Sequence, residues 1–153
     1  MTTLKIGDKA PLFKGIDQYG SSIQLIDFKG KKVVLFFYPK ASTPGCTAQA
    51  CNLQNNIDYF IENNYQVIGV SADTQQRQLN FSNKNDLSYP LIADENKNII
   101  EAYGVWGNKK FMGKEYDGIH RTTFIIDEKG VIEKIIEKVK TKDHTSQIQD
   151  LTV

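Results

Sequence analysis

The feature that most constrains the fold is an apolar run at 33–38 that leads through a Thr-Pro-Gly turn into an amphipathic segment. A short run rich in valine and aromatic residues predicts a buried β-strand. The segment at 47–64 is expected to be helical, because its apolar residues fall on one helical face: Ala50, Leu53, Ile57, Phe60 and Ile61. A second buried strand is expected at 66–71, which completes a βαβ unit.

The rest of the chain continues this alternation. It predicts a helix at 74–85, a strand at 91–93 and a second helix at 95–103. A hairpin of two strands follows at 121–126 and 131–137, and a last helix at 143–151. Such an order favours an α/β protein in which a central mixed β-sheet is flanked by helices on both faces. The thioredoxin-like fold fits this order best.

Length and composition limit the classes of protein. With 153 residues, of which 40% are hydrophobic, the chain is expected to form one domain, 1–153, that needs no disulfide for stability. Residues 1–8 carry no apolar signal core, and no apolar run approaches the length of a membrane span. We therefore expect a cytoplasmic protein without membrane contact. A net charge of +1 argues against a nucleic-acid partner.

The chain has two cysteines, Cys46 and Cys51, and we expect its function to depend on them. In a reducing compartment a cysteine pair is more often catalytic, redox-active or metal-binding than structural. Cys46 directly follows the Thr-Pro-Gly turn, at the expected start of a helix. There the helix dipole and unpaired backbone N–H groups stabilise a thiolate. The position predicts a reactive thiol at Cys46.

The spacing of the cysteines restricts how they can pair. On one helix, residues five apart are rotated by about 140° and separated by about 7.5 Å of rise. A disulfide needs Cα atoms within about 7 Å and converging Cβ vectors. Either the two thiols never pair, or the first turn of the helix must unwind, for which the preceding Pro-Gly provides a hinge.

Arg121 is one of only two arginines, and its ordinary interpretation is a surface ion pair, because nothing local places it near Cys46. Its functional interpretation is a fixed fork of donors that holds a thiolate and an oxyanion together, which lysine could not replace. The aromatic residues Trp106, Phe111 and Tyr116 also leave two interpretations open: core packing, or an apolar collar around a substrate pocket.

Other kinds of cysteine site fit less well. A zinc site built from the two cysteines with His120 and His144 has the wrong spacing. A cysteine phosphatase needs arginine where this chain has Asn52. A Cys/His hydrolase needs a histidine near Cys46, and both histidines are expected at the surface or behind the site. A thioredoxin-like reductase would carry Cys-x-x-Cys, which is missing here.

The run from Tyr38 to Cys51 resembles the peroxidatic loop of peroxiredoxins, whose Pro-x-x-x-Thr-x-x-Cys signature falls on Pro39, Thr43 and Cys46. A cysteine five residues later resembles the bacterioferritin-comigratory-protein or Q-type subgroup. The resemblance extends along the chain, through the segments 7–13, 104–113 and 116–127. Many members carry glutamate two residues before the second cysteine, where this chain has Gln49.

The resemblance implies a thioredoxin-dependent thiol peroxidase that reduces hydrogen peroxide and organic hydroperoxides. Cys46 would be the peroxidatic thiolate, oxidised to a sulfenic acid, and Cys51 the resolving thiol that closes an intramolecular disulfide. Thr43 would hydrogen-bond the thiolate and the peroxide, Arg121 would hold both, and Pro39 would shield the pocket. Thioredoxin or a similar dithiol protein would be the partner, no metal, haem or flavin would be needed, and the subgroup suggests a monomer or weak dimer.

Overall fold

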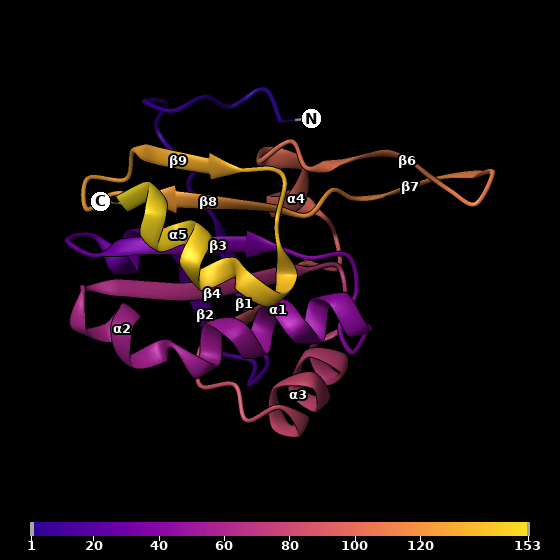
Figure 1. The fold of residues 1–153 in the computed structure, drawn as a ribbon, viewed down its shortest axis with the longest axis horizontal. Coiled ribbons are helices and arrows are strands. Elements are labelled where there is room, and N and C mark those ends of the chain that lie inside the picture. The colour runs from indigo at the N-terminus through magenta and orange to yellow at the C-terminus, as the bar shows by residue number, and fades with distance from the viewer. Residues whose placement is uncertain (1, 153) are drawn as a thin grey trace.

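The computed structural model describes residues 2–152 and is built around a five-stranded mixed sheet in the order β5-β4-β3-β8-β9 (Figure 1). The strands are β3 (Lys32–Phe37), β4 (Tyr65–Ser71), β5 (Leu91–Ala93), β8 (Thr122–Ile126) and β9 (Ile132–Ile136). β3, β4 and β5 run parallel, whereas β8 is antiparallel to both β3 and β9. The predicted central mixed sheet is confirmed.

The continuous apolar run in β3 follows from its position in the middle of the sheet. Val33, Leu35 and Phe37 contribute to one hydrophobic cluster, whereas Val34 and Phe36 contribute to a second one. A strand that is covered on both faces needs apolar side chains in every position rather than in alternate ones. The expected helices on both faces are therefore required by the sequence of this strand.

Four helices cover one face of the sheet. They are α1 (Pro44–Asn55), α2 (Ile57–Glu62), α3 (Gln75–Lys84) and α5 (His144–Thr152), which follows the short 3-10 helix η2 (Thr141–Asp143). The first three and α5 bury Leu53, Phe60, Phe81 and Ile148 in the same cluster. The other face is covered by α4 (Asn98–Ala102), the 3-10 helix η1 (Leu25–Phe28) and the hairpin of β1 (Lys14–Ile16) with β2 (Ser22–Gln24). The prediction of helices on both faces is confirmed.

Two predicted helices have different bounds in the structure. The helix expected at 47–64 begins earlier, at Pro44, because proline at a first helical position is already in helical geometry. It also breaks at Asn56, whose backbone leaves helical geometry, so that Ile61 in α2 is exposed instead of sharing the buried face. The helix expected at 95–103 is reduced to α4, since Lys97 before it adopts a left-handed backbone conformation with φ of 61°.

Between α4 and β8 the chain forms an arm that the sequence pattern did not predict. Its strands β6 (Trp106–Phe111) and β7 (Lys114–Ile119) pair with each other and extend away from the sheet in Figure 1. Phe111 and Tyr116 are 65% and 47% exposed, so core packing is the wrong interpretation for them, whereas Trp106 is half-buried and packs against the core. None of the described helices is both long and apolar enough to cross a membrane.

Candidate active site

Cys46 lies beyond the carboxyl end of β3, where loops of a parallel sheet commonly form ligand sites. The chain leaves β3 at Phe37, passes through the loop 38–43 and enters α1, of which Cys46 is the third residue. Its side chain is 1% exposed and belongs to the cluster between the sheet and α1. The expected position at the start of a helix is thus confirmed, and the side chain of Cys46 is shielded from bulk water.

Asp73 anchors the loop that leads to Cys46. Its Oδ2 accepts hydrogen bonds from the backbone N–H of Ala41 and the hydroxyl of Ser71, both at 2.7 Å. Asp73 is buried, and Arg77 Nη1 lies 3.9 Å from its Oδ1. A buried carboxylate that accepts a backbone N–H bond fixes the loop firmly. Sequence reasoning missed Asp73, although an Asp two residues after the end of a predicted strand could have indicated it.

A second buried network lies beside this anchor. The hydroxyl of Tyr38 donates to Gln78 Oε1, and Gln78 Nε2 donates to Ser71 Oγ and to the carbonyl of Ile92, both at 2.9 Å. Burial raises the pKa of Tyr38 well above its ordinary value, so its hydroxyl stays neutral. Together these bonds hold the end of β3, the start of α3 and β5 in one arrangement around the loop.

The N-terminus of α1 has no side-chain cap. Thr43 occupies the N-cap position, but its hydroxyl donates to the carbonyl of Lys40 at 2.8 Å instead of accepting from the helix. The N–H groups of a first helical turn have no partners within the helix. Those of Gly45 and Cys46 therefore remain available to an anion or a polar oxygen. The expected bond from Thr43 to the Cys46 thiolate is not among the hydrogen bonds of the described residues.

Arg121 reaches Cys46 from the start of the neighbouring strand β8. Its Nη2 lies 3.3 Å from Cys46 Sγ, and its Nη1 donates to Gln49 Oε1 at 2.6 Å. Arg121 directly precedes β8, and the pairing of Thr122 with Phe37 places it next to the end of β3. The interpretation as a surface ion pair is therefore wrong, because the antiparallel register brings together residues that are 75 positions apart.

Two further groups shape the surroundings of Arg121. Gly45 in α1 lies so close to Arg121 that a Cβ added to this glycine would be 3.3 Å from Arg121 Nη2. Lys109 on β6 donates to the carbonyl of Ile119 at 2.9 Å, and its pKa is lowered by burial and by the charge of Arg121, while Cys46 acts in the opposite direction. With Arg121 it lines a cleft of about 330 Å³. Sequence reasoning considered Gly45 only as part of a hinge and did not single out Lys109.

Cys51 lies on the same helix as Cys46, and both are free thiols. Its Sγ is 3.6 Å from Asn85 Oδ1 at the end of α3, and burial raises the pKa of this thiol. Between the two cysteines, the carbonyl of Ala50 accepts a hydrogen bond from the hydroxyl of Tyr89 at 2.8 Å. With α1 intact the pair cannot bond, as the spacing predicted.

The remaining predicted residues do not contact Cys46 through any hydrogen bond of the described residues. Pro39 is half-buried in the loop before α1. His120 Nε2 lies 3.0 Å from the carbonyl oxygen of Asn108. His144 is fully buried, so of its two expected places, at the surface or behind the site, the surface is excluded. No cluster of three metal-ligating side chains occurs among residues 2–152.

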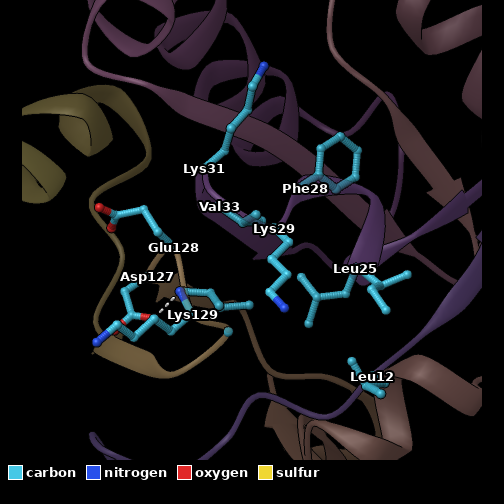
Figure 2. Close-up of a pocket in the computed structure, with 12 residues that line it drawn as sticks. Leu12, Leu25, Phe28, Lys29, Lys31, Val33, Asp127, Glu128 and Lys129 are labelled. Carbon is cyan, nitrogen blue, oxygen red and sulfur yellow. Dashed lines mark hydrogen bonds between the residues drawn. The ribbon is translucent and has the colours of Figure 1, made fainter.

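A separate hollow of about 190 Å³ lies at the amino end of β3, the opposite end from the one that leads to Cys46 (Figure 2). Figure 2 shows apolar Leu12, Leu25 and Phe28 on one side, Lys129 on the other and Lys29 between them. Its lining contains neither a thiol nor a guanidinium. We therefore place the candidate active site at Cys46.

Known proteins resemble this chain over most of its length. Residues 6–135 match the model of the AhpC/TSA family. The peroxiredoxin Bcp of Escherichia coli (strain K12) is 46% identical over 144 residues, which cover 94% of this chain and 92% of that protein. The peroxiredoxin Bcp of Bacillus subtilis (strain 168) is 43% identical over 145 residues, with 95% and 92% covered.

Solved structures show the same fold. A mutant of Xylella fastidiosa PrxQ is similar with a TM-score of 0.91 at 25% identity, covering 98% of this chain and 96% of that one. The bacterioferritin comigratory protein of Xanthomonas campestris, whose structures concern its alkyl peroxide reduction activity, has a TM-score of 0.87 at 27% identity, with 99% and 98% covered. Both similarities extend over nearly the whole chain.

Proposed function

Since the chain belongs to the AhpC/TSA family and its relatives named above are peroxiredoxins, we propose that it is a thiol peroxidase whose Cys46 reduces hydrogen peroxide and alkyl hydroperoxides. The observation that carries the proposal is the buried Cys46 at an uncapped helix N-terminus with Arg121 Nη2 3.3 Å from its sulfur. A guanidinium and free N–H groups favour the thiolate and attract the oxygens of a peroxide.

In the first step the Cys46 thiolate attacks the hydroxyl oxygen of the hydroperoxide. The S–O bond forms as the O–O bond breaks, which yields a sulfenic acid and an alkoxide that takes up the proton lost by the thiol. Arg121 stabilises the charge that develops on the leaving oxygen. Because the Thr43 proton points to the Lys40 carbonyl, the Thr43 oxygen accepts the O–H of the peroxide, and Pro39 keeps water from the pocket.

In the second step Cys51 displaces the sulfenic hydroxyl. Its sulfur bonds to Cys46 Sγ, and water leaves with the Cys51 proton. The first part of α1 must unwind for this contact. While the helix is intact, burial raises the pKa of Cys51, so the resolving thiol stays protonated and apart from Cys46 until the first turn opens.

In the third step a dithiol protein such as thioredoxin reduces the disulfide by thiol exchange and becomes oxidised itself. This reductant works in a reducing compartment, so we infer a cytoplasmic location. All the reacting groups come from one chain, which is consistent with a single-domain monomer or weak dimer. The three steps need no metal, haem or flavin.

The test is peroxide consumption coupled to thioredoxin, with Cys46→Ser and Cys51→Ser measured beside the wild type. Cys46→Ser is expected to lose all peroxide reduction. Cys51→Ser is expected to perform one fast turnover and then to accumulate the sulfenic acid, which dimedone labelling and mass spectrometry detect. Peroxide reduction by Cys46→Ser would refute the assignment, and full turnover by Cys51→Ser without added thiol would refute the intramolecular disulfide.

A further inference from the structure

Gln49 and Cys46 are joined through one guanidinium. Gln49 lies three residues after Cys46 on α1, so both side chains are on the same side of the helix. Its Oε1 accepts from Arg121 Nη1 at 2.6 Å, while Nη2 of the same arginine lies 3.3 Å from Cys46 Sγ. Gln49 is completely buried. The amide therefore sets the direction of the fork that contacts the thiol.

The chemistry of arginine determines the orientation of this amide. A guanidinium has donors only, so the oxygen of Gln49, and not its nitrogen, must face Nη1. Nε2 then points away from the arginine, and it has no hydrogen-bond partner among the described residues. An unpartnered buried donor is destabilising and uncommon in native proteins, so its presence calls for an explanation.

The explanation that we find in the site is electrostatic. An amide oxygen orients Arg121 without bringing a negative charge. A carboxylate of the same shape would accept the same bond, but its charge would also offset part of the guanidinium field that acts on Cys46. Preorganised positive charge near a reacting sulfur and a leaving oxygen is most effective where water is excluded, and the side chains of Cys46 and Gln49 are both buried.

We propose that Gln49 is a positioning residue: it fixes the fork of Arg121 through Oε1 and leaves the full positive charge of the guanidinium to Cys46 and the peroxide. The unpartnered Nε2 is the consequence of fulfilling this role with a neutral amide. The inference rests on the proposed function, because the charge affects the rate only if Cys46 reacts as a thiolate.

Two substitutions separate orientation from charge, each made in the full chain with Cys51→Ser so that Cys46 is the single thiol. Gln49→Glu keeps an acceptor for Arg121 and adds a charge. Gln49→Met keeps the volume and removes the acceptor. Gln54→Glu is the matched control, because it adds the same charge to α1 at a residue whose oxygen accepts from Ser88 instead of Arg121.

Three measurements are made on each variant: the rate of Cys46 alkylation by iodoacetamide at neutral pH, the rate constant of a single turnover with hydrogen peroxide, and thermal unfolding. Gln49→Glu is expected to slow both reactions about tenfold, the effect of one added charge within a few ångströms, without a lower unfolding temperature. Gln49→Met is expected to slow the peroxide reaction about tenfold, with a smaller effect on alkylation. Gln54→Glu is expected to match the parent protein.

Wild-type rates of both reactions in Gln49→Glu would overturn the proposal, as would equal slowing in Gln54→Glu. If the buried carboxylate prevents folding, Gln49→Met decides, and an unchanged single-turnover rate in that variant would overturn the orienting role. Alkylation by iodoacetamide needs no peroxide, so it measures the reactivity of Cys46 even if the proposed peroxide reaction does not occur. Failure of the proposed function would appear as peroxide reduction by Cys46→Ser, whereas failure of this inference would leave that control inactive and the Gln49 variants as fast as the parent.

Discussion

At the scale of single residues, Gly45 allows Arg121 to approach the reactive thiol. An added Cβ on Gly45 would lie 3.3 Å from Nη2, and the same Nη2 is 3.3 Å from Cys46 Sγ. The guanidinium is thus held between the start of α1 and the sulfur, where little space remains. Since the backbone of Gly45 has no positive φ, the reason for glycine here is space rather than conformation.

Gly45→Ala is therefore expected to reduce activity without loss of stability. The methyl group displaces Nη2 by a few tenths of an ångström, and we expect peroxide reduction to slow by about tenfold, because small misplacements of catalytic groups are costly. Alanine favours a helix over glycine by up to about 1 kcal/mol, so the unfolding temperature should stay equal or rise. Unchanged single-turnover kinetics would contradict this prediction.

At the scale of elements, α1 carries both cysteines and is pinned on two sides. The hydroxyl of Tyr89 binds the carbonyl of Ala50 between them. Further along the helix, Asn52 donates to the carbonyl of Lys142 and accepts from the N–H of Thr145. These bonds attach the second half of α1 to α5 and its approach, so the turn nearest the uncapped N-terminus is the part that can open at lowest cost.

Tyr89→Phe is expected to speed disulfide formation. Loss of the bond to Ala50 weakens the closed helix by about 1 kcal/mol, which corresponds to about fivefold more of the open form. Stopped-flow fluorescence of the single tryptophan after one equivalent of peroxide would follow the second, resolving phase. Tyr103→Phe is the matched control, since it removes a hydroxyl bond to the Pro11 carbonyl on the other face of the sheet. Equal effects of the two variants would exclude a specific role of Tyr89.

The observed strands and helices also show which parts of the fold the sequence pattern could predict. The strands β3, β4 and β5 and the hairpin of β8 with β9 were predicted nearly at their observed bounds, because each is an apolar run bounded by turn residues. The β6–β7 arm was missed, since its strands are exposed and show no apolar alternation. The break at Asn56 was missed as well, because the apolar spacing continues across it.

At the scale of the whole molecule, His144 links the last helix to the sheet. It is fully buried, with Nε2 2.8 Å from Thr123 Oγ1 and Nδ1 2.9 Å from Gln147 Oε1. Burial, and to a lesser degree the charge of Arg121, lowers its pKa, although the bond to Gln147 acts in the opposite direction. The neutral ring therefore belongs to the folded state.

The sign of the pH dependence follows from this lowered pKa. Below about pH 6.5 the unfolded chain binds a proton on His144 that the folded chain does not, so stability falls as the pH decreases, by at most about 1.4 kcal/mol per pH unit. Urea unfolding between about pH 7 and about pH 5 should show this slope, and His144→Gln should flatten it. His120→Gln is the control, because it removes the other, half-exposed histidine. The same slope in His144→Gln as in the wild type would refute the assignment.

Local chemistry along the chain specified the βαβ order, the helix start at Cys46 and a cysteine spacing that prevents pairing on an intact helix, because each depends on near neighbours and on helix or strand geometry. The contact of Arg121 with Cys46 and Gln49 depends instead on the register of β8 against β3. Pairing of strands that are far apart in the chain is decided by the packing of the whole sheet. For that reason the resemblance could name Arg121, but only the tertiary structure showed its contact with the thiol and the side chain that holds it in place.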